Sequence, residues 1–192
     1  GLDKLEALTR LLEIEEWNAI IIFVRTRVEC QFLSEKLSAR GYAATALSGE
    51  VAQKQREEIV NQMKKGKLDI IIATDVAARG IDIPGVRHVY NYDLPNVAEN
   101  YVHRIGRTAR AGKNGAAVAF CAPDEMGELI AIQKVMKIRI PVASGRPWED
   151  SEIPDKPKQS RGRGRGRSGG GGGGGCFGHG CHLGHGVSFR SR

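Results

Sequence analysis

Four short segments of this sequence collect groups that donate hydrogen bonds to anions. They are residues 25–27, 48–56, 74–82 and 103–112, and together they hold several arginines, hydroxyl side chains and glycines. Guanidinium groups pair with phosphate through two parallel hydrogen bonds, hydroxyls donate to it, and backbone N–H groups bind it where the chain approaches closely. If the fold gathers these segments on one edge, the chemistry they favour is phosphate binding.

The sequence around these segments alternates apolar runs with amphipathic runs, which is typical of βαβ units around a parallel sheet. The unbroken run 19–24 is rich in β-branched residues and predicts a strand buried on both faces. The expected strands are 19–24, 43–47, 70–73, 88–92 and 116–121, and the expected helices are 2–12, 27–40, 53–65, 97–104 and 125–137. The fold class is therefore α/β, a parallel sheet of about five strands sandwiched by helices. Ligands bind such sheets at the carboxyl ends of the strands, where three of the four segments begin.

The composition indicates one globular domain followed by chain of a different kind. Of the 192 residues, 41% are hydrophobic and 27% are charged, as in ordinary soluble domains. No run approaches about 18 apolar residues, and the first residues do not resemble a signal peptide. We therefore expect no membrane partner and a cytoplasmic location. Domain boundaries are expected at 1–150 for the folded part and 151–192 for the tail.

The tail accounts for most of the net charge of +7. Six of the 29 basic residues follow Ser160, no acidic residue does, and 14 of the 25 glycines lie there. A chain of this composition cannot bury enough apolar surface to offset its backbone entropy, so residues from about 151 are expected to be disordered.

The string of residues 73–82, followed by residues 103–107, resembles motifs V and VI of DEAD-box RNA helicases. Residues 23–27 resemble motif IV, and Gln53 with Arg56 resembles the QxxR element that follows it. Four motifs in the family's order make this a specific signal. The resemblance covers about residues 2 to 145 and is to the second of the family's two RecA-like lobes, of the bacterial type.

The resemblance implies roles in ATP hydrolysis for three residues. Arg107 and Arg110 match the arginine fingers that reach the γ-phosphate of ATP held by the other lobe, where positive charge stabilises the transition state. Asp82 matches the carboxylate that binds the ATP ribose. ATP and Mg²⁺ are then the implied cofactors, both held mainly by an N-terminal RecA-like lobe that is the implied partner.

The resemblance also implies RNA as a partner. Contacts to the RNA phosphate and sugar backbone position the strand without reading its bases. The matching residues for RNA are Thr26, Gly49, Gln53, Arg56, Thr74 and Gly80. The residues that match those coupling the two lobes are Arg79, His103 and Arg104.

Each assignment has a structural alternative. Arg107 and Arg110 are also explained as hydrated surface arginines. Asp82 is also explained as a cap for the following Pro84-Gly85 turn, and Thr74 as a residue that hydrogen-bonds its own backbone.

An NTPase of this kind also needs a phosphate-binding loop of the form G-x-x-x-x-G-K-[ST] and a carboxylate for magnesium. The pairs Gly66-Lys67 and Gly112-Lys113 are followed by Leu68 and Asn114, and the sequence has no Asp-Glu-Ala-Asp run. We therefore expect these 192 residues alone to bind RNA weakly and not to hydrolyse ATP.

Three functions are compared for these residues. The leading one, from the resemblance, is an ATP-dependent RNA helicase of which this chain is the second lobe, and which separates short duplexes by bending one strand between two closing lobes. The alternative is a stand-alone RNA-binding or adaptor module without ATPase activity. A DNA translocase lobe is disfavoured by His103, because related DNA-acting families often have Gln there.

The tail offers two further candidates. Its Arg-Gly repeats, at residues 161–167, supply mobile charge that attracts RNA without sequence preference, although a solubilising linker has the same composition. Its cysteines and histidines match the spacing of no common zinc finger, so we expect no metal site. These tail residues are Cys176, His179, Cys181, His182 and His185.

The other two cysteines, Cys30 and Cys121, lie among apolar residues and are expected to be small buried side chains.

Overall fold

The structure, a computed structural model, describes residues 2–81, 83, 86–107, 116–144 and 187–191. Seven strands in the described part of the chain form one sheet in the order β2-β3-β1-β4-β5-β7-β6. The first five of these in space are parallel to one another, whereas β7 is antiparallel to both of its neighbours. The strands are β1 (Ile20–Phe23), β2 (Ala44–Leu47), β3 (Ile70–Ala73), β4 (His88–Asn91), β5 (Ala116–Cys121), β6 (Val142–Ser144) and β7 (Val187–Ser191).

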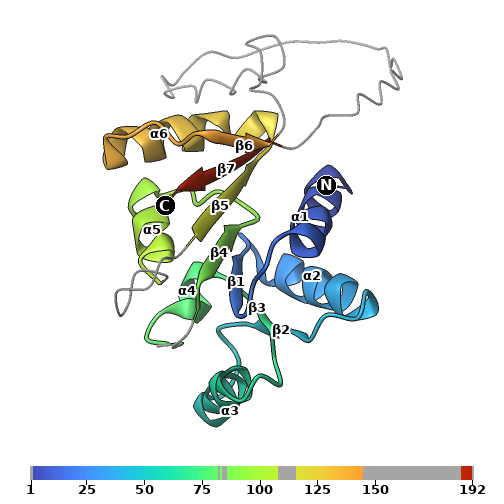
Figure 1. Cartoon of the computed structure of the whole chain (residues 1–192). Helices are drawn as coiled ribbons and strands as arrows, with labels where there is room; N and C mark the ends of the chain where they lie inside the picture. The colour runs from blue at the N-terminus through green and yellow to red at the C-terminus, as the bar shows by residue number, and fades with distance from the viewer. Residues whose placement is uncertain (1, 82, 84–85, 108–115, 145–186, 192) are drawn as a thin grey trace, which may run out of the picture.

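Helices cover both faces of the sheet (Figure 1). On one face α1 (Leu2–Ile14) and α2 (Arg27–Ala39) pack against Ile20, Ile22 and neighbouring strand residues. The opposite face is covered by α3 (Gln53–Lys64), α4 (Asp75–Ala78), α5 (Ala98–Ile105) and α6 (Met126–Met136), with the short 3₁₀ turn η1 (Pro123–Glu125) before α6. Alternate residues of β1 point to opposite faces, so Ile21 and Phe23 join the second core while Ile20 and Ile22 join the first.

The buried central strands explain why the apolar runs of the sequence are continuous. All four residues of β1 and all four of β3 are buried, because helices cover the sheet on both sides. The prediction of an α/β fold with a parallel sheet between helices is confirmed. Each predicted strand and helix is present, with ends that differ by no more than two residues from the expected bounds.

Three features differ from the sequence-based expectations. The sheet has seven strands rather than five, because β6 and β7 extend it beyond β5. β7 lies in the region 151–192, where no strand is expected, and its residues 187–191 pair with the edge of β5 and so complete its backbone hydrogen bonds. Residues 145–186 of that region lie outside the described residues. The short helix α4 is a further difference, since the expected helices include none between residues 73 and 88.

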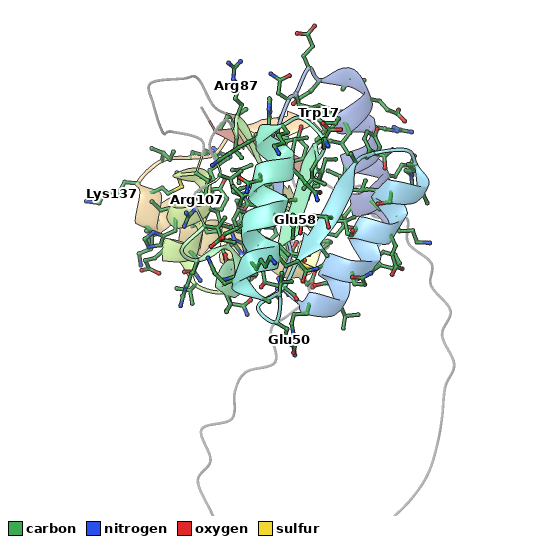
Figure 2. All side chains as sticks on the ribbon, turned by 90° about the horizontal axis from the view of Figure 1, so that it is seen from below. Trp17, Glu50, Glu58, Arg87, Arg107 and Lys137 are labelled. Atoms are coloured by element: carbon green, nitrogen blue, oxygen red, sulfur yellow. The ribbon has the colours of Figure 1, made fainter. Side chains whose placement is uncertain are left out.

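The carboxyl ends of the parallel strands form one edge of the molecule. Glu50, which follows β2, lies at one end in Figure 2, and Trp17 and Arg87, which precede β1 and β4, lie at the other. The candidate segments of the sequence are therefore on the Glu50 side. Among the described residues no helix is both long and apolar enough to span a membrane.

Candidate functional site

The segment after β1 is held by a capping box at the start of α2. The Thr26 Oγ1 accepts a hydrogen bond from the Glu29 N–H at 3.2 Å, and the Glu29 carboxylate accepts from the Thr26 N–H at 3.0 Å. Arg27 forms an exposed ion pair with Glu50, which lies after β2. These contacts present Thr26 at the N-terminus of a helix, where the helix dipole favours anions, and they join the first two segments.

The segment after β2 leads into α3, whose first turn carries Gln53 and Arg56. The Arg56 Nη2 donates to the Ala77 carbonyl in α4 at 2.6 Å, which connects α3 to the segment after β3. Its Nε is buried and has no hydrogen-bond partner among the described residues. Gln53 donates from Nε2 to the Glu57 carboxylate at 3.1 Å. Gly49 is exposed at the same end of the sheet.

The segment after β3 forms the one-turn helix α4. Thr74 ends the strand and caps this helix, because its Oγ1 accepts from the Ala77 N–H at 3.3 Å. Arg79 and Gly80 follow the helix and are exposed. Gly80 has φ +73°, in the left-handed region that side-chain-bearing residues rarely adopt, so the turn there favours glycine.

Arg104 on α5 is almost fully buried, with 2% of its surface exposed, and connects three elements. It pairs with both oxygens of Asp75 at 2.6 and 2.9 Å. Its Nη1 donates to the Asn91 side chain at 3.0 Å and to the Asp93 carbonyl at 2.7 Å. The guanidinium lies 4.8 Å from the centre of the Phe23 ring. All three guanidinium nitrogens of Arg104 therefore have hydrogen-bond partners within the domain.

Arg107 follows Arg104 by three residues. Like Arg104, it connects segment 103–112 to segment 74–82. Its Nη1 donates to the Ile81 carbonyl at 3.1 Å. It is half-buried at the rim of an open hollow of about 380 Å³. The hollow is lined by Phe23, Asp75, Ala78, Arg79, Asn100, His103, Arg104 and Arg107. Three of its four cationic or imidazole side chains, those of Arg79, His103 and Arg107, remain accessible, so the hollow suits an anionic ligand.

A second open hollow, of about 340 Å³, lies between α3 and the turn after α4. Its lining consists of Gln53, Arg56, Glu57, Val60, Asn61, Lys64, Gly80 and Ile81. Ile81 therefore lines this hollow while its carbonyl accepts a hydrogen bond from Arg107, which lines the first one.

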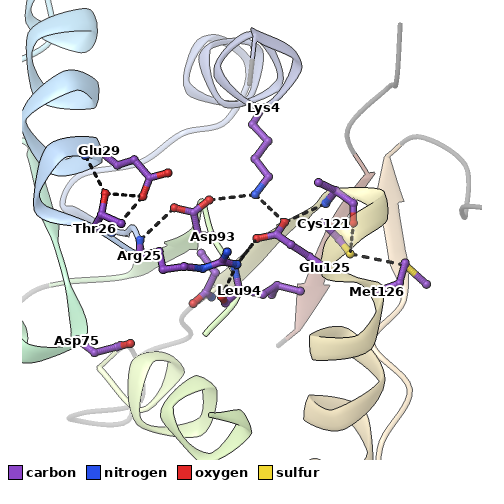
Figure 3. Close-up of polar contacts among 12 residues, drawn as sticks. Lys4, Arg25, Thr26, Glu29, Asp75, Asp93, Leu94, Cys121, Glu125 and Met126 are labelled. Carbon is purple, nitrogen blue, oxygen red and sulfur yellow. Dashed lines mark hydrogen bonds and ion pairs between the residues drawn. The ribbon is translucent and has the colours of Figure 1, made fainter. Parts of the chain in front are cut away.

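An ionic network anchors segment 25–27 to the interior of the domain (Figure 3). Lys4 on α1 contacts Asp93 at 3.0 Å and Glu125 at 2.6 Å. The same two carboxylates bind Arg25, Asp93 through the Arg25 N–H at 3.0 Å and Glu125 through the guanidinium at 3.0 Å. Glu125 also accepts from the Leu94 N–H at 3.2 Å. Two cations thus neutralise two buried anions where α1 and the ends of β1, β4 and β5 meet.

Residues 3–112 match the family described as "Helicase conserved C-terminal domain". This chain belongs to that family, within the DEAD-box group. It is 44% identical over 149 residues to the ATP-dependent RNA helicase CshA of Listeria monocytogenes, covering 78% of this chain and 29% of the relative. It is 52% identical over 134 residues to the ATP-dependent RNA helicase DeaD of Mycobacterium tuberculosis, covering 70% of this chain and 24% of the relative. The chain thus spans about a quarter of the length of these curated relatives.

A solved structure supports the same assignment. The E. coli DEAD-box protein SrmB, in its complex with the regulator of ribonuclease activity A, aligns with a TM-score of 0.70 and 35% identity. The alignment covers 81% of this chain and 89% of the SrmB chain. The DEAD-box recognition and the RecA-like fold predicted from the sequence are therefore both confirmed.

The DEAD-box fold brings most of the predicted site residues to one edge of the sheet. Gln53, Arg56 and Gly80 line one hollow, and Arg79, His103, Arg104 and Arg107 line the other. Thr26, Gly49 and Thr74 follow β1, β2 and β3 at the same edge. Asp82 and Arg110 lie outside the described residues.

Several residues that organise this DEAD-box site are absent from the sequence-based predictions. Asp75 lies inside the motif V string, but nothing in the string indicates that it pairs with Arg104. Three further residues, Asn91, Asp93 and Glu125, lie in strands or just after them. The available signal for them was a polar residue that follows an apolar run. Lys4 carries no signal of its own, since its partners are far away in the sequence.

The described residues contain no group of three or more histidine, cysteine or acidic side chains suited to hold a metal ion. The cysteines and histidines of the tail, at residues 176–185, lie outside the described residues. Cys30 and Cys121 are buried, as predicted. Burial raises the pKa of each thiol to about 12, with smaller contributions from Glu29 for Cys30 and from Glu125 for Cys121.

Proposed function

We propose that this chain is the second lobe of an ATP-dependent RNA helicase. The supporting observation is the joint placement of motifs V and VI, in which Arg104 binds Asp75 and Arg107 binds the Ile81 carbonyl. The relatives CshA and DeaD carry the name ATP-dependent RNA helicase. Because the chain matches about a quarter of their length, the activity belongs to a two-lobed assembly in which this lobe supplies one side of each ligand site.

The RNA strand binds along the edge formed by the first three segments. Thr26 and Thr74 cap helices, and backbone N–H groups near such helix starts donate to anionic oxygen. Arg56 contributes a positive charge with an unpaired Nε. These contacts reach phosphate and ribose rather than base edges, so binding is independent of sequence. The proposed RNA-binding residues are Thr26, Gly49, Gln53, Arg56, Thr74 and Gly80.

ATP binds between this lobe and an N-terminal RecA-like lobe. Arg107 is the proposed arginine finger: it retains further N–H donors besides the one on Ile81 and lies at an accessible rim. Arg110 is the proposed second finger and Asp82 the proposed ribose ligand. A guanidinium near the γ-phosphate offsets the negative charge of the transferring group. Mg²⁺, held mainly by the other lobe, neutralises charge on the same phosphates.

Arg79, His103 and Arg104 are proposed to couple the lobes in two different ways. Arg79 and His103 are exposed beside Arg107 and are placed to contact the other lobe directly. Arg104 is buried, so it acts from within, by holding α4 and therefore Thr74 and Gly80 in position relative to α5.

RNA binding is tested with the 192-residue chain by fluorescence anisotropy on single-stranded RNA. We expect weak binding that Arg56→Ala reduces, and no RNA-stimulated ATP hydrolysis by the chain alone. The exposed Lys54→Ala, on the same helix but outside the second hollow, is the matched control. ATP turnover by the purified chain would contradict the assignment of the catalytic cradle to another lobe.

The finger assignment requires both lobes, so it is tested in a chimaera in which this chain replaces the matching region of the Listeria monocytogenes CshA. We expect ATP hydrolysis and duplex unwinding, with Arg107→Ala lowering kcat about 10³-fold, as for other arginine fingers, while ATP binding changes little. RNA binding without any chimaera activity would instead favour the adaptor function. An active chimaera unaffected by Arg107→Ala would remove Arg107 from the catalytic site.

The Arg-Gly tail is proposed to hold RNA near the lobe through mobile positive charge. An RNA helicase acts where RNA is, so we propose a cytoplasmic location, in keeping with the bacterial relatives.

A further inference from the structure

The second hollow extends well beyond Gln53 and Arg56, the two residues of α3 in the family motif. Glu57, Val60, Asn61 and Lys64 continue along one face of α3, at the spacing of three to four residues that places side chains on the same side of a helix. From Gln53 to Lys64 the helix rises by about 16 Å. The hollow is therefore an elongated groove whose two ends both carry amide and basic side chains.

Gly80 and Ile81 line the side of this groove opposite α3. Gly80 has no side chain, its φ is +73°, and no heavy atom lies within 4 Å of the position that a Cβ would take. Ile81 continues this wall. A ligand is thus able to approach the main chain on one side while it contacts α3 on the other.

The charge of the groove suits a phosphate-bearing strand. Arg56 and Lys64 are its two cations, and Glu57 is its one carboxylate among the described lining residues. The Glu57 carboxylate accepts from Gln53 Nε2 at 3.1 Å, which disperses part of its negative charge. Arg56 Nε is buried without a partner, which leaves a guanidinium donor unsatisfied in this region. Gln53 and Asn61 offer amide groups suited to ribose hydroxyls.

We propose that an RNA strand bound at Gln53 and Arg56 continues along α3, with Lys64 binding a phosphate and Asn61 a neighbouring sugar or phosphate oxygen. This proposal rests on the proposed RNA-binding function and extends it to two residues outside the motifs. Lys64 is exposed at the last turn of α3, where its ammonium group is free to follow a flexible strand.

The test measures binding of the full chain to oligouridines of about 4 to 12 nucleotides, the range over which single-strand sites extend. The variants are Asn61→Ala and Lys64→Ala, with Gln55→Ala and Lys65→Ala as matched controls. Gln55 and Lys65 are exposed residues of the same helix region that do not line the groove. Thermal unfolding of every variant checks that the fold is retained.

We expect Lys64→Ala to weaken binding of the longer oligonucleotides roughly three- to tenfold at low salt and to lower the slope of log Kd against log salt by about 0.7, the value for one phosphate contact on a single strand. The shortest oligonucleotides, which reach only the motif residues, are expected to be unaffected. Asn61→Ala is expected to weaken binding less and to leave the salt slope unchanged.

The outcomes separate this proposal from the proposed function. If Arg56→Ala weakens binding while Lys64→Ala matches Lys65→Ala at every length, the extended track is wrong and the RNA-binding function stands. If neither Arg56→Ala nor Lys64→Ala has an effect, the RNA-binding function itself is contradicted. If Lys64→Ala weakens the binding of free ATP as much as that of RNA, and its effect does not depend on RNA length, Lys64 belongs to a mononucleotide site. That result would overturn the extended track.

Discussion

Arg104 on α5 and Asp75 on α4 form a two-point ion pair, at 2.6 and 2.9 Å, in which the arginine is 2% exposed. Asp75 directly follows Thr74, the cap of α4 and a proposed RNA ligand. Arg104 lies three residues before Arg107, the proposed finger. This contact therefore fixes α4, which Thr74 caps, relative to α5, which Arg107 follows.

Replacing Arg104 by alanine leaves Asp75, Asn91 and the Asp93 carbonyl without their common donor. We expect the free energy of unfolding to fall by about 3 kcal/mol, the range for breaking one partner of a buried ion pair. Arg104→Lys is expected to recover only part of this, because an ammonium group lacks the planar fork that binds both carboxylate oxygens. Urea denaturation followed by circular dichroism measures the difference, and equal stability of Arg104→Ala and wild type would contradict the buried role.

The ionic network around Lys4 gives a second prediction. Lys4→Met removes one of two cations from a cluster in which Asp93 and Glu125 are 7% and 3% exposed. We expect a loss of roughly 3 kcal/mol in the free energy of unfolding, because a buried negative charge is left uncompensated. The exposed Lys54→Met is the control and is expected to change stability by less than about 0.5 kcal/mol. A similar effect of both variants would mean that the network adds no stability.

The two glycines proposed to contact RNA are expected to respond differently to alanine. Gly80 has φ +73°, so Gly80→Ala is expected to cost about 1 to 2 kcal/mol of backbone strain even though there is room for a methyl group. A Cβ at Gly49 meets only Val76 Cγ1, at an ordinary contact distance of 3.9 Å, and Gly49→Ala is expected to be nearly neutral. Thermal unfolding distinguishes the two, and equal losses would place the cost elsewhere than in the φ angle of Gly80.

The buried thiols lead to a prediction about pH. Burial raises the pKa of Cys30 and of Cys121 from 9.0 to about 12, so the unfolded chain loses these protons at lower pH than the folded chain does. The stability that this difference contributes is fully present below pH 9 and is lost as the pH rises from 9 towards 12. Cys30 and Cys121 are also expected to resist alkylation at pH 8, because the thiolate is the reactive form.

The measurement is the rate of iodoacetamide labelling, followed by intact mass, in a background with Cys176→Ser and Cys181→Ser. These replacements remove the tail thiols from the count. Labelling in denaturant is the positive control. Fast labelling of the folded chain would show that the two thiols are accessible.

The Arg-Gly tail is expected to dominate the salt dependence of RNA binding. Replacing Arg161, Arg163, Arg165 and Arg167 by serine is expected to lower the slope of log Kd against log salt by about 3, since each phosphate contact on a single strand contributes about 0.7. The unfolding curve of the folded domain is expected to stay the same. An unchanged slope would favour the solubilising-linker interpretation.

The parallel sheet and the location of the candidate site follow from the sequence by a short physical argument. Continuous apolar runs such as Ile70–Ala73 require cover on both faces, and helices between them enforce parallel strands. Parallel strands bring their carboxyl ends to one edge, so residues after Phe23, Leu47 and Ala73 had to lie near one another. This is why Thr26, Gln53 and Thr74 are predictable as members of one site.

The tertiary structure alone decided which charged residues pair. Lys4 and Asp93 are 89 positions apart, and Arg104 and Asp75 are 29 positions apart, so no local period links them. The same holds for β7, whose place depends on the unpaired edge of β5 rather than on its own composition. Local patterns determine which residues face a core or follow a strand, whereas the inward turn of Arg104 and the groove that runs from Arg56 to Lys64 depend on the distances between packed elements.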